Sequence, residues 1–391
     1  MTTDEFIHQF READVRQLAL RGKRYPDVDL PFALNQIQGW QTARQKLPHW
    51  AATEGIIYPP HVNMEQCSSE ATARYKRSVL ARWGCLDSVC DLTGGFGVDL
   101  STLADLFASA SYVERNSGLC DLVRHNLSCL GLSHVSVHCA DAATFLHGLA
   151  HCSVIFLDPS RRDDHGGRVF YLADCSPDVT SMADELLSKA DVVMLKLSPM
   201  LDWHEALSAL PAVREVHIVA VDNECKDLLL VLSSRPSPLR LFCANGPVVF
   251  ACDEAELRLA DVPLLPADDL PAGYLFEPNA AVMKAGVFAA LCRRFGVVGV
   301  GPNSHLFFSD HDVSAFPGRR FRILSVFTMN KRDLRTHLSG LTHANISVRN
   351  FPLPVAALRK RLRLADGGAC YLFATTLTGA RHVIVSAEKC P

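Results

Sequence analysis

A glycine-rich segment has the residue types that could hold a small ligand. It reads Val89-Cys-Asp91-Leu-Thr93-Gly94-Gly95-Phe-Gly97-Val-Asp99, an apolar stretch that runs into closely spaced glycines. Glycine admits positive φ and lets a ligand approach the backbone closely. A dinucleotide fingerprint, G-x-G-x-x-G, would need a third glycine where Leu100 stands, so that class of site is not indicated. The segment predicts a ligand-binding turn between a strand and a helix, with a sharp turn that binds nothing as the alternative.

Three more acids stand where predicted apolar strands end, at Glu114, Asp141 and Asp158. Doubly wound sheets bind ligands outside the carboxyl ends of their strands, so these carboxylates and Asp91 are expected to share one edge. Any one of them alone is more often a helix N-cap or a solvated turn residue. Four acids at successive strand ends are a more specific signal. Together they predict one ligand site, with Ala142 at its border.

The segment that follows the last of these acids is expected to hold a second reactant. It reads Asp158-Pro159-Ser160-Arg161-Arg162. Adjacent arginines suit a phosphate or carboxylate, because guanidinium groups bind such anions through paired hydrogen bonds. Structural ion pairs are the competing interpretation, nearly as strong for Arg162.

A lysine, Lys196, ends the fifth predicted strand and begins a polar segment that continues to Asp202. On the same sheet edge it would form a second rim of the ligand site and could contact the second reactant. Lysines at strand ends also extend their ammonium to solvent along an apolar stem, and this alternative stays open.

These residues need a parallel sheet to bring them together, and the pattern of apolar segments predicts one. Short apolar strands alternate with amphipathic segments such as 117–130 and 179–190, which are long enough for crossover helices. Only residues 222–227 separate the last two strands, so these must form a hairpin, with one antiparallel strand at the end of the sheet. The predicted fold is a doubly wound α/β sheet with seven strands, at residues 88–92, 110–114, 135–139, 154–157, 192–197, 215–221 and 228–232.

The chain of 391 residues is expected to have more than one domain. Residues 1–84 predict a helical N-terminal region with an apolar stripe, and residues 85–250 contain the doubly wound sheet. Residues 251–271 predict a linker, because they end in a proline-rich acidic stretch. Residues 272–391 predict an α+β domain with a helix over 281–295.

Composition is that of an ordinary packed protein, with 48% hydrophobic and 21% charged residues. No stretch approaches the roughly 18 apolar residues that cross a bilayer, and the start of the chain does not resemble a signal peptide. We therefore expect a cytoplasmic protein without membrane contact. Fourteen cysteines are scattered with no C-x-x-C pair, so no metal or disulfide framework is expected.

Charge is distributed unevenly, and this indicates a phosphate-bearing partner. From Pro271 onward there are 16 Lys and Arg against 6 Asp and Glu, whereas the first 270 residues hold 23 against 36. Several phosphate contacts would give salt-dependent binding with little sequence preference. A solvated basic face is the alternative. The candidate contacts are Arg319, Arg320 and Arg322, then Lys331, Arg332 and Arg335, and finally Arg359, Lys360, Arg361 and Arg363.

The glycine-rich turn and the strand-end acids resemble class I methyltransferases. Longer segments resemble the bacterial members of this class that carry a C-terminal THUMP-like region, and this resemblance covers most of the chain. It implies S-adenosylmethionine as cofactor and, because THUMP domains are associated with structured RNA, an RNA partner. The matching segments are Ser69-Glu70-x-Thr72-Ala73-x-Tyr75-Lys76, Asp158-Pro-Ser-Arg-Arg162, Lys196-Leu-Ser-Pro199, Asn223-Glu-Cys-Lys226, Tyr274-Leu-Phe-Glu277-Pro278-Asn279, Lys284-Ala-Gly286 and Phe316-Pro-Gly-Arg319.

The resemblance also implies cofactor roles. The glycine-rich turn would pack against the methionine part of S-adenosylmethionine, and Asp91 would orient its amino group. Thr93 replaces the commoner first glycine of this turn. Glu114 would accept hydrogen bonds from both ribose hydroxyls, and Asp141 would face the adenine amino group.

In this class the Asp158 segment would hold the accepting atom in line with the methyl group, or take its proton. Nucleic-acid amine methyltransferases carry a second proline and an aromatic residue after the Asp-Pro pair. Ser160 and Arg161 stand there instead, which weakens an assignment to exocyclic adenine amine chemistry.

The sequence therefore predicts transfer of a methyl group from S-adenosylmethionine to a base in structured RNA, such as tRNA or rRNA. Two other functions stay open: a methyltransferase for a small molecule or protein, and a non-catalytic RNA-binding protein that retains the cofactor pocket. In the first, activity and RNA affinity would not depend on the C-terminal domain. In the second, the cofactor would bind without methyl transfer.

Overall fold

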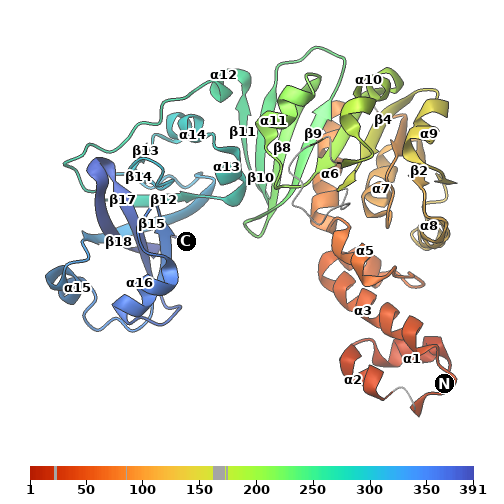
Figure 1. Cartoon of the computed structure of the whole chain (residues 1–391), viewed down its shortest axis with the longest axis horizontal. Helices are drawn as coiled ribbons and strands as arrows, with labels where there is room; N and C mark the ends of the chain where they lie inside the picture. The colour runs from red at the N-terminus through yellow and green to blue at the C-terminus, as the bar shows by residue number, and fades with distance from the viewer. Residues whose placement is uncertain (22–23, 85, 162–171, 173–174) are drawn as a thin grey trace. The chain divides into compact units, whose positions relative to one another are not determined.

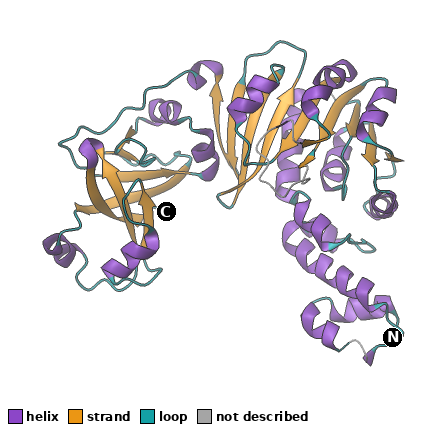
Figure 2. Cartoon of the chain, viewed as in Figure 1, coloured by secondary structure: helices purple, strands orange, loops and turns teal. Residues whose placement is uncertain are grey.

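The computed structural model describes residues 1–21, 24–84, 86–161, 172 and 175–391 (Figures 1 and 2). These residues form two compact units. Unit 1 comprises Met1–Val216 with Lys226–Ser237, and unit 2 comprises His217–Cys225 with Pro238–Pro391. The helical N-terminal region and the strands that carry the four acids all belong to unit 1.

Unit 1 is built on a mostly parallel sheet. The β1–β2, β2–β3, β1–β4 and β4–β7 pairs are parallel, whereas β9 runs antiparallel to β7. The order reverses between β1 and β4, where doubly wound sheets bind ligands. The antiparallel strand lies inside the sheet and not at its end, because β8 follows it. The order is β3 (Val135–Cys139), β2 (Ser109–Glu114), β1 (Ser88–Asp91), β4 (Cys152–Leu157), β7 (Ala190–Leu197), β9 (Glu224–Leu232) and β8 (Val213–Val221). Two further strands, β10 (Arg240–Asn245) and β11 (Val248–Asp253), follow β8, so the sheet has nine strands and the prediction of seven is wrong.

Helices cover this sheet and enclose its core. Strands β4 and β7 are buried along almost their whole length, which explains their nearly continuous apolar sequences. Phe156 and Met194 on these strands pack with Tyr112 of β2 and Val123 of a covering helix. The expected crossover helices are present as α8 (Ser117–Cys129) and α10 (Val179–Lys189), alongside α7 (Val98–Leu103), α9 (Ala142–Gly148) and α11 (Trp203–Ala209).

The N-terminal region is helical, as predicted, and packs directly on the glycine-rich turn. Trp50, Tyr58 and Met64 share an apolar cluster with Phe96 and Val98 of the turn. The last N-terminal helix begins at a serine cap and ends at a glycine with φ of 71°. The six helices are α1 (Thr3–Phe10), α2 (Val15–Leu20), α3 (Leu30–Lys46), α4 (Pro48–Ala52), α5 (His61–Gln66) and α6 (Glu70–Trp83).

The second segment of unit 2 begins with a hairpin that the sequence analysis missed. Strands β10 and β11 pair antiparallel, and α12 (Glu254–Leu257) follows. Further along, the backbone N–H of Leu265 donates to the carbonyl of Gly299. The expectation of a linker over residues 251–271 is therefore wrong at its start, because that range opens with regular structure.

The rest of unit 2 is a second sheet with helices, which agrees with the predicted α+β character. The helix expected over 281–295 is two helices, because Gly286 takes a φ of 72° and ends the first. The helices are α13 (Ala280–Ala285), α14 (Phe288–Phe295), α15 (Lys331–His337) and α16 (Val355–Leu362). The strand order is β13 (Val298–Gly299), β14 (Phe307–Ser309), β12 (Tyr274–Pro278), β15 (Gly318–Phe327), β18 (Arg381–Lys389), β17 (Cys370–Leu377) and β16 (Asn345–Arg349).

Two absences hold for the described part of the chain. None of its helices combines the length and apolar character needed to span a membrane. Its His, Cys, Asp and Glu side chains form no group of three or more that could hold a metal ion.

Candidate active site

A cavity of about 1020 Å³ opens at the carboxyl ends of the parallel strands in unit 1. It brings together the residues that the sequence analysis placed in one ligand site. Helix α5 supplies part of the wall, through Asn63 and Gln66, and so does the segment Cys175–Asp178. The predicted residues that line it are Asp91, Thr93, Gly94, Gly95, Gly97, Asp99, Glu114, Asp141, Ala142, Asp158, Pro159, Ser160 and Lys196.

The glycine-rich turn is shaped by a tyrosine beneath it. A Cβ added at Gly94 would lie 2.1 Å from Cε2 of Tyr112, so contact with this fully buried ring requires glycine there. The Tyr112 hydroxyl donates a hydrogen bond of 2.5 Å to the carbonyl of Gly95. Gly95 and Gly97 have φ of 52° and 79°, values that glycine adopts without strain. The turn is thus held in place by its own neighbours.

Thr93 connects two of the predicted segments. Its hydroxyl accepts a hydrogen bond of 2.6 Å from the backbone N–H of Asp158, which joins the turn after β1 to the loop after β4. The residue that replaces the commoner glycine therefore fixes the loop expected to hold the second reactant. The sequence contained no signal for this contact.

The carboxylates around the cavity are held by backbone N–H groups. Asp91 is 1% exposed and accepts from the N–H of Thr93 at 3.0 Å. Burial raises the pKa of Asp91 well above its usual range, and the nearby acids Asp99, Asp158 and Glu114 raise it further. A cationic ligand beside Asp91 would relieve this destabilisation of the ionised carboxylate.

Glu114 and Asp141 border the same cavity. Glu114 accepts from the backbone N–H groups of Gly95, at 3.2 Å, and Asn116, at 2.9 Å. Asp141 is the N-cap of α9, and its side-chain hydrogen bonds all go to Oδ1. Its Oδ2 has no partner among the described residues. Capping and ligand binding are therefore compatible at Asp141.

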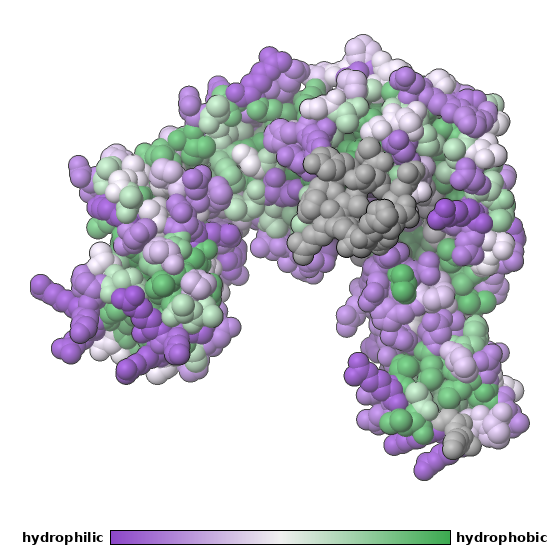
Figure 3. Space-filling view, viewed as in Figure 1, coloured by the Kyte–Doolittle hydropathy of each residue, from purple (hydrophilic) through white to green (hydrophobic). Residues whose placement is uncertain are grey.

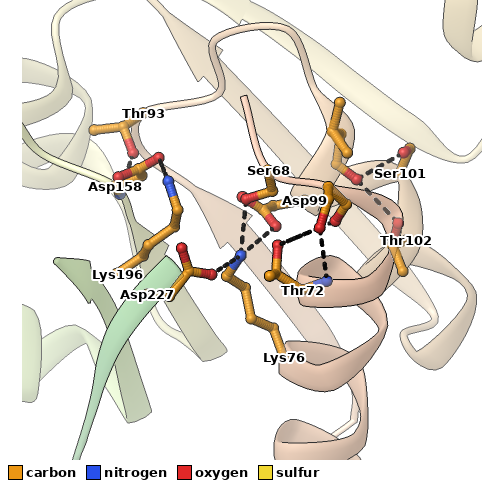
Figure 4. A network of polar contacts seen from close by, with 12 residues as sticks. Ser68, Thr72, Lys76, Thr93, Asp99, Ser101, Thr102, Asp158, Lys196 and Asp227 are labelled. Carbon is orange, nitrogen blue, oxygen red and sulfur yellow. Dashed lines mark hydrogen bonds and ion pairs between the residues drawn. The ribbon is translucent and has the colours of Figure 1, made fainter. Parts of the chain in front are cut away.

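A network of charged side chains also borders the cavity, and Figure 4 shows its contacts. The ammonium of Lys196 forms an ion pair with Asp158. Behind it, the fully buried Lys76 of α6 lies 2.9 Å from Oδ1 of Asp99 and 3.0 Å from Oδ2 of Asp227. Two lysines and three carboxylates thus lie in a row from Lys76 on α6 to Asp158 on the loop after β4.

A serine completes this network. Ser68 accepts a hydrogen bond of 2.8 Å from the Lys76 ammonium and donates one of 2.7 Å to Asp99 Oδ2. The sequence analysis named Lys76 only as part of a family segment and missed Ser68 and Asp227. A lysine on the apolar face of a predicted helix, beside Ala73 and Leu80, was the signal that could have identified it.

The network shifts the pKa values of its own carboxyl and amine groups. Burial alone would raise the pKa of Asp99, but the Lys76 ammonium, with Lys196 and Ser68, holds it below the usual range. Burial raises the pKa of Asp158, and the Lys196 ammonium opposes that rise. For Lys196, burial favours the neutral amine, yet Asp158, Asp99 and Asp227 together raise its pKa. Lys196 is therefore an ammonium.

The acceptor segment is described in part. The Ser160 hydroxyl donates to the carbonyl of Ser176, and residues 160–161 pair with Cys175–Ser176 as strands β5 and β6. The proposed anion contact Arg162 lies outside the described residues.

The predicted basic residues of unit 2 divide into two groups. Arg319 pairs with Glu277, and Arg320 pairs with Asp312. Arg359 pairs with Asp366. In contrast, Lys360 and Arg361 on α16 are exposed, as are Lys331, Arg332 and Arg335 on α15.

The donor groups around the cavity fit a nucleoside with a cationic amino-acid part. Carboxylates at Glu114 and Asp141 suit ribose hydroxyls and an amino base, and the buried Asp91 suits an ammonium. Gly95 lines the cavity, and a Cβ there would have no atom nearer than 3.8 Å on the protein side, so its bare backbone lets such a ligand approach the turn. This donor set matches S-adenosylmethionine.

Comparison with known proteins supports the same cofactor. A THUMP domain-like family model matches residues 318–389, and a ferredoxin-like domain model matches residues 274–317. A crystal structure of a Porphyromonas gingivalis W83 protein, assigned as a methyltransferase, is 30% identical with a TM-score of 0.87, covering 99% of this chain and 97% of that one. Two Mycobacterium tuberculosis sequences, from strains CDC 1551 and H37Rv, are named uncharacterized S-adenosylmethionine-dependent methyltransferases. Each is 28% identical over 336 residues, covering 84% of this chain and 87% of the relative. The chain therefore belongs to the family of class I S-adenosylmethionine-dependent methyltransferases that carry a C-terminal THUMP-like region.

Proposed function

We propose that this enzyme transfers the methyl group of S-adenosylmethionine to a nucleotide of structured RNA, such as tRNA or rRNA. The observation that carries the RNA assignment is a group of exposed basic side chains on the THUMP-like region that form no ion pair with any residue the structure describes. We call it the basic patch, and it consists of Lys331, Arg332, Arg335, Lys360 and Arg361.

The basic patch is presented by two helices on one sheet face. Leu334 of α15 and Leu358 of α16 pack into the same apolar cluster, together with Phe327, Leu372 and Ile384 of the sheet. The apolar sides of both helices face inward, so their charged residues face solvent. Hydrophilic side chains gather over α15 and α16 in the space-filling view (Figure 3). Five cations with no ion pair among the described residues suit a polyanion.

The arginines with acidic partners contribute less to this proposal. Arg319, Arg320 and Arg359 would have to exchange their carboxylate partners for phosphate, which reduces the gain from each contact. We therefore assign the main phosphate contacts to the basic patch, and keep these three arginines as secondary candidates.

In the cavity, we assign cofactor binding to the glycine-rich turn with Asp91, Glu114 and Asp141. Asp158 orients the accepting atom, with Pro159, Ser160 and Arg161 next to it. S-adenosylmethionine supplies an activated methyl group, so positioning and charge placement provide most of the acceleration.

The test is methyl transfer from radiolabelled S-adenosylmethionine to total RNA from a strain that lacks this gene. We expect label in RNA with the full-length protein. Asp158→Ala should abolish incorporation with cofactor affinity nearly intact, whereas Asp121→Ala, which removes an exposed carboxylate on α8, should keep it. Cofactor binding with no label in RNA would refute the proposal and favour a small molecule or protein as acceptor.

A further inference from the structure

We infer that the accepting atom is a ribose 2′-hydroxyl oxygen and not a nitrogen of a base. The inference rests on the proposed function and names the chemical group on that RNA. It revises the base predicted from the sequence. The observation behind it is the network of lysines and carboxylates beside the cavity, formed by Lys196, Asp158, Lys76, Asp99 and Asp227 (Figure 4).

A hydroxyl that accepts a methyl group needs a base and a cation beside it, and this network contains both. It is a weak nucleophile until its proton begins to leave, so it requires a proton acceptor and a cation for the charge that develops on oxygen. Asp158 and Lys196 are joined as an ion pair and both line the cavity. The ion pair uses Oδ2 of Asp158, which leaves Oδ1 to accept a proton from a hydroxyl.

A base nitrogen needs the opposite surroundings. A neutral amine attacks through its lone pair, and its N–H groups require hydrogen-bond acceptors that hold them in line. Lys196 has only donors, and three carboxylates keep it charged.

The described lining also offers no ring on which a base could stack. Its aromatic residues are Phe96 and Phe156, which are 3% and 1% exposed and belong to the apolar core. Arg161 stands at the position where amine methyltransferases carry an aromatic residue, and the hydroxyl of Ser160, at the position of their second proline, donates to the carbonyl of Ser176. Enzymes that act on a base hold it by stacking and edge contacts. A ribose needs no such surface.

Lys76 acts as a positioning residue. It is fully buried and does not line the cavity, but it holds Asp99 and Asp227, whose charges keep Lys196 protonated. Helix α6 thereby positions two of the carboxylates that, after Asp158, raise the pKa of Lys196.

The transfer balances with these groups. S-adenosylmethionine, when bound, supplies a methyl carbon whose bond to sulfur breaks as the bond to the acceptor oxygen forms, and sulfur keeps the electron pair. The Lys196 ammonium donates a hydrogen bond to the acceptor oxygen. Asp158 takes the hydroxyl proton and later releases it to water. The products are a methyl ether, a neutral thioether and one proton.

Alkaline hydrolysis of the labelled RNA tests the inference. A 2′-O-methyl group blocks cleavage of the adjacent phosphodiester, so we expect the label in alkali-stable dinucleotides. Label in mononucleotides would overturn the inference while leaving RNA as the substrate. Absence of label from RNA, with cofactor binding intact, would instead overturn the proposed function and this inference with it.

A second measurement concerns Lys196 itself. Lys196→Met should lower kcat by about 100-fold or more, the scale of removing one donor to a developing oxyanion, with cofactor affinity little changed. Lys196→Arg, which keeps the charge, should retain more activity. Lys389→Met removes an exposed lysine in unit 2 and should match the wild type. Full activity in Lys196→Met would refute the inference.

Discussion

Replacing the buried lysine of α6 would measure how much the charge network stabilises unit 1. Lys76→Met removes the ammonium that lies within 3.0 Å of two buried carboxylates, Asp99 and Asp227. Loss of one partner of a buried ion pair costs about 3–5 kcal/mol, because the remaining charge is left uncompensated. At about 2–4 °C per kcal/mol for a unit of this size, the unfolding midpoint should fall by roughly 10 °C.

The pH dependence of this loss has a defined sign. Lys76 depresses the pKa of Asp99, so its stabilisation is present above the unfolded-state pKa of about 3.9 and disappears as pH falls through the lower folded value. In Lys76→Met, Asp99 loses its counter-ion and protonates more readily. The variant should therefore approach the wild type in stability as pH falls from about 7 towards about 4.

Thermal unfolding followed by circular dichroism over this pH range is the assay. Arg82→Met is the matched control, because Arg82 lies on the same helix and its half-exposed pair with Glu215 is worth about 0–1 kcal/mol. Adding Asp99→Asn and Asp227→Asn to Lys76→Met should restore part of the stability. A midpoint in Lys76→Met equal to that of Arg82→Met, or a deficit that does not change with pH, would refute this reasoning.

Three further predictions concern the cavity and the basic patch. Gly94→Ala places a methyl group against the buried Tyr112 ring, so it should cost about 1–3 kcal/mol of stability. The displaced turn should also bind the cofactor more weakly in calorimetric titration, and unchanged affinity would contradict the assignment of the cofactor site to this turn. Because the pKa of Asp91 is raised, cofactor affinity should fall as pH is lowered through that pKa, and Asp91→Asn should bind weakly with little pH dependence. Neutralising the basic patch to glutamine should weaken RNA binding and flatten its dependence on log salt by about 0.7–0.9 per lost phosphate contact, whereas Arg320→Gln should change the slope little.

Much of unit 1 could be predicted from the sequence because its signals are local. Strands β4 and β7 are continuous apolar runs, and each acid of the site follows a strand directly. The connection between β8 and β9 is short because Asp222 and Asn223 both take positive φ, which closes the hairpin in two residues.

Other features depend on contacts between distant residues and had no local pattern. The role of Thr93 appears only when the loops after β1 and β4 meet, and that of Lys76 only when α6 packs on α7. In unit 2, the count of basic residues in the sequence treated every arginine as free to bind phosphate. The acids that pair with Arg320 and Arg322, Asp312 and Glu388, stand elsewhere in the sequence.

The tyrosine beneath the glycine-rich turn bears on how quickly the cofactor is captured. Because the ring of Tyr112 is fully buried and its hydroxyl holds the carbonyl of Gly95, the turn has its binding shape before any ligand arrives. Association then loses little backbone entropy at this segment. Capture at the turn should be a single-step encounter, and differences in residence time should arise from the contacts that follow it.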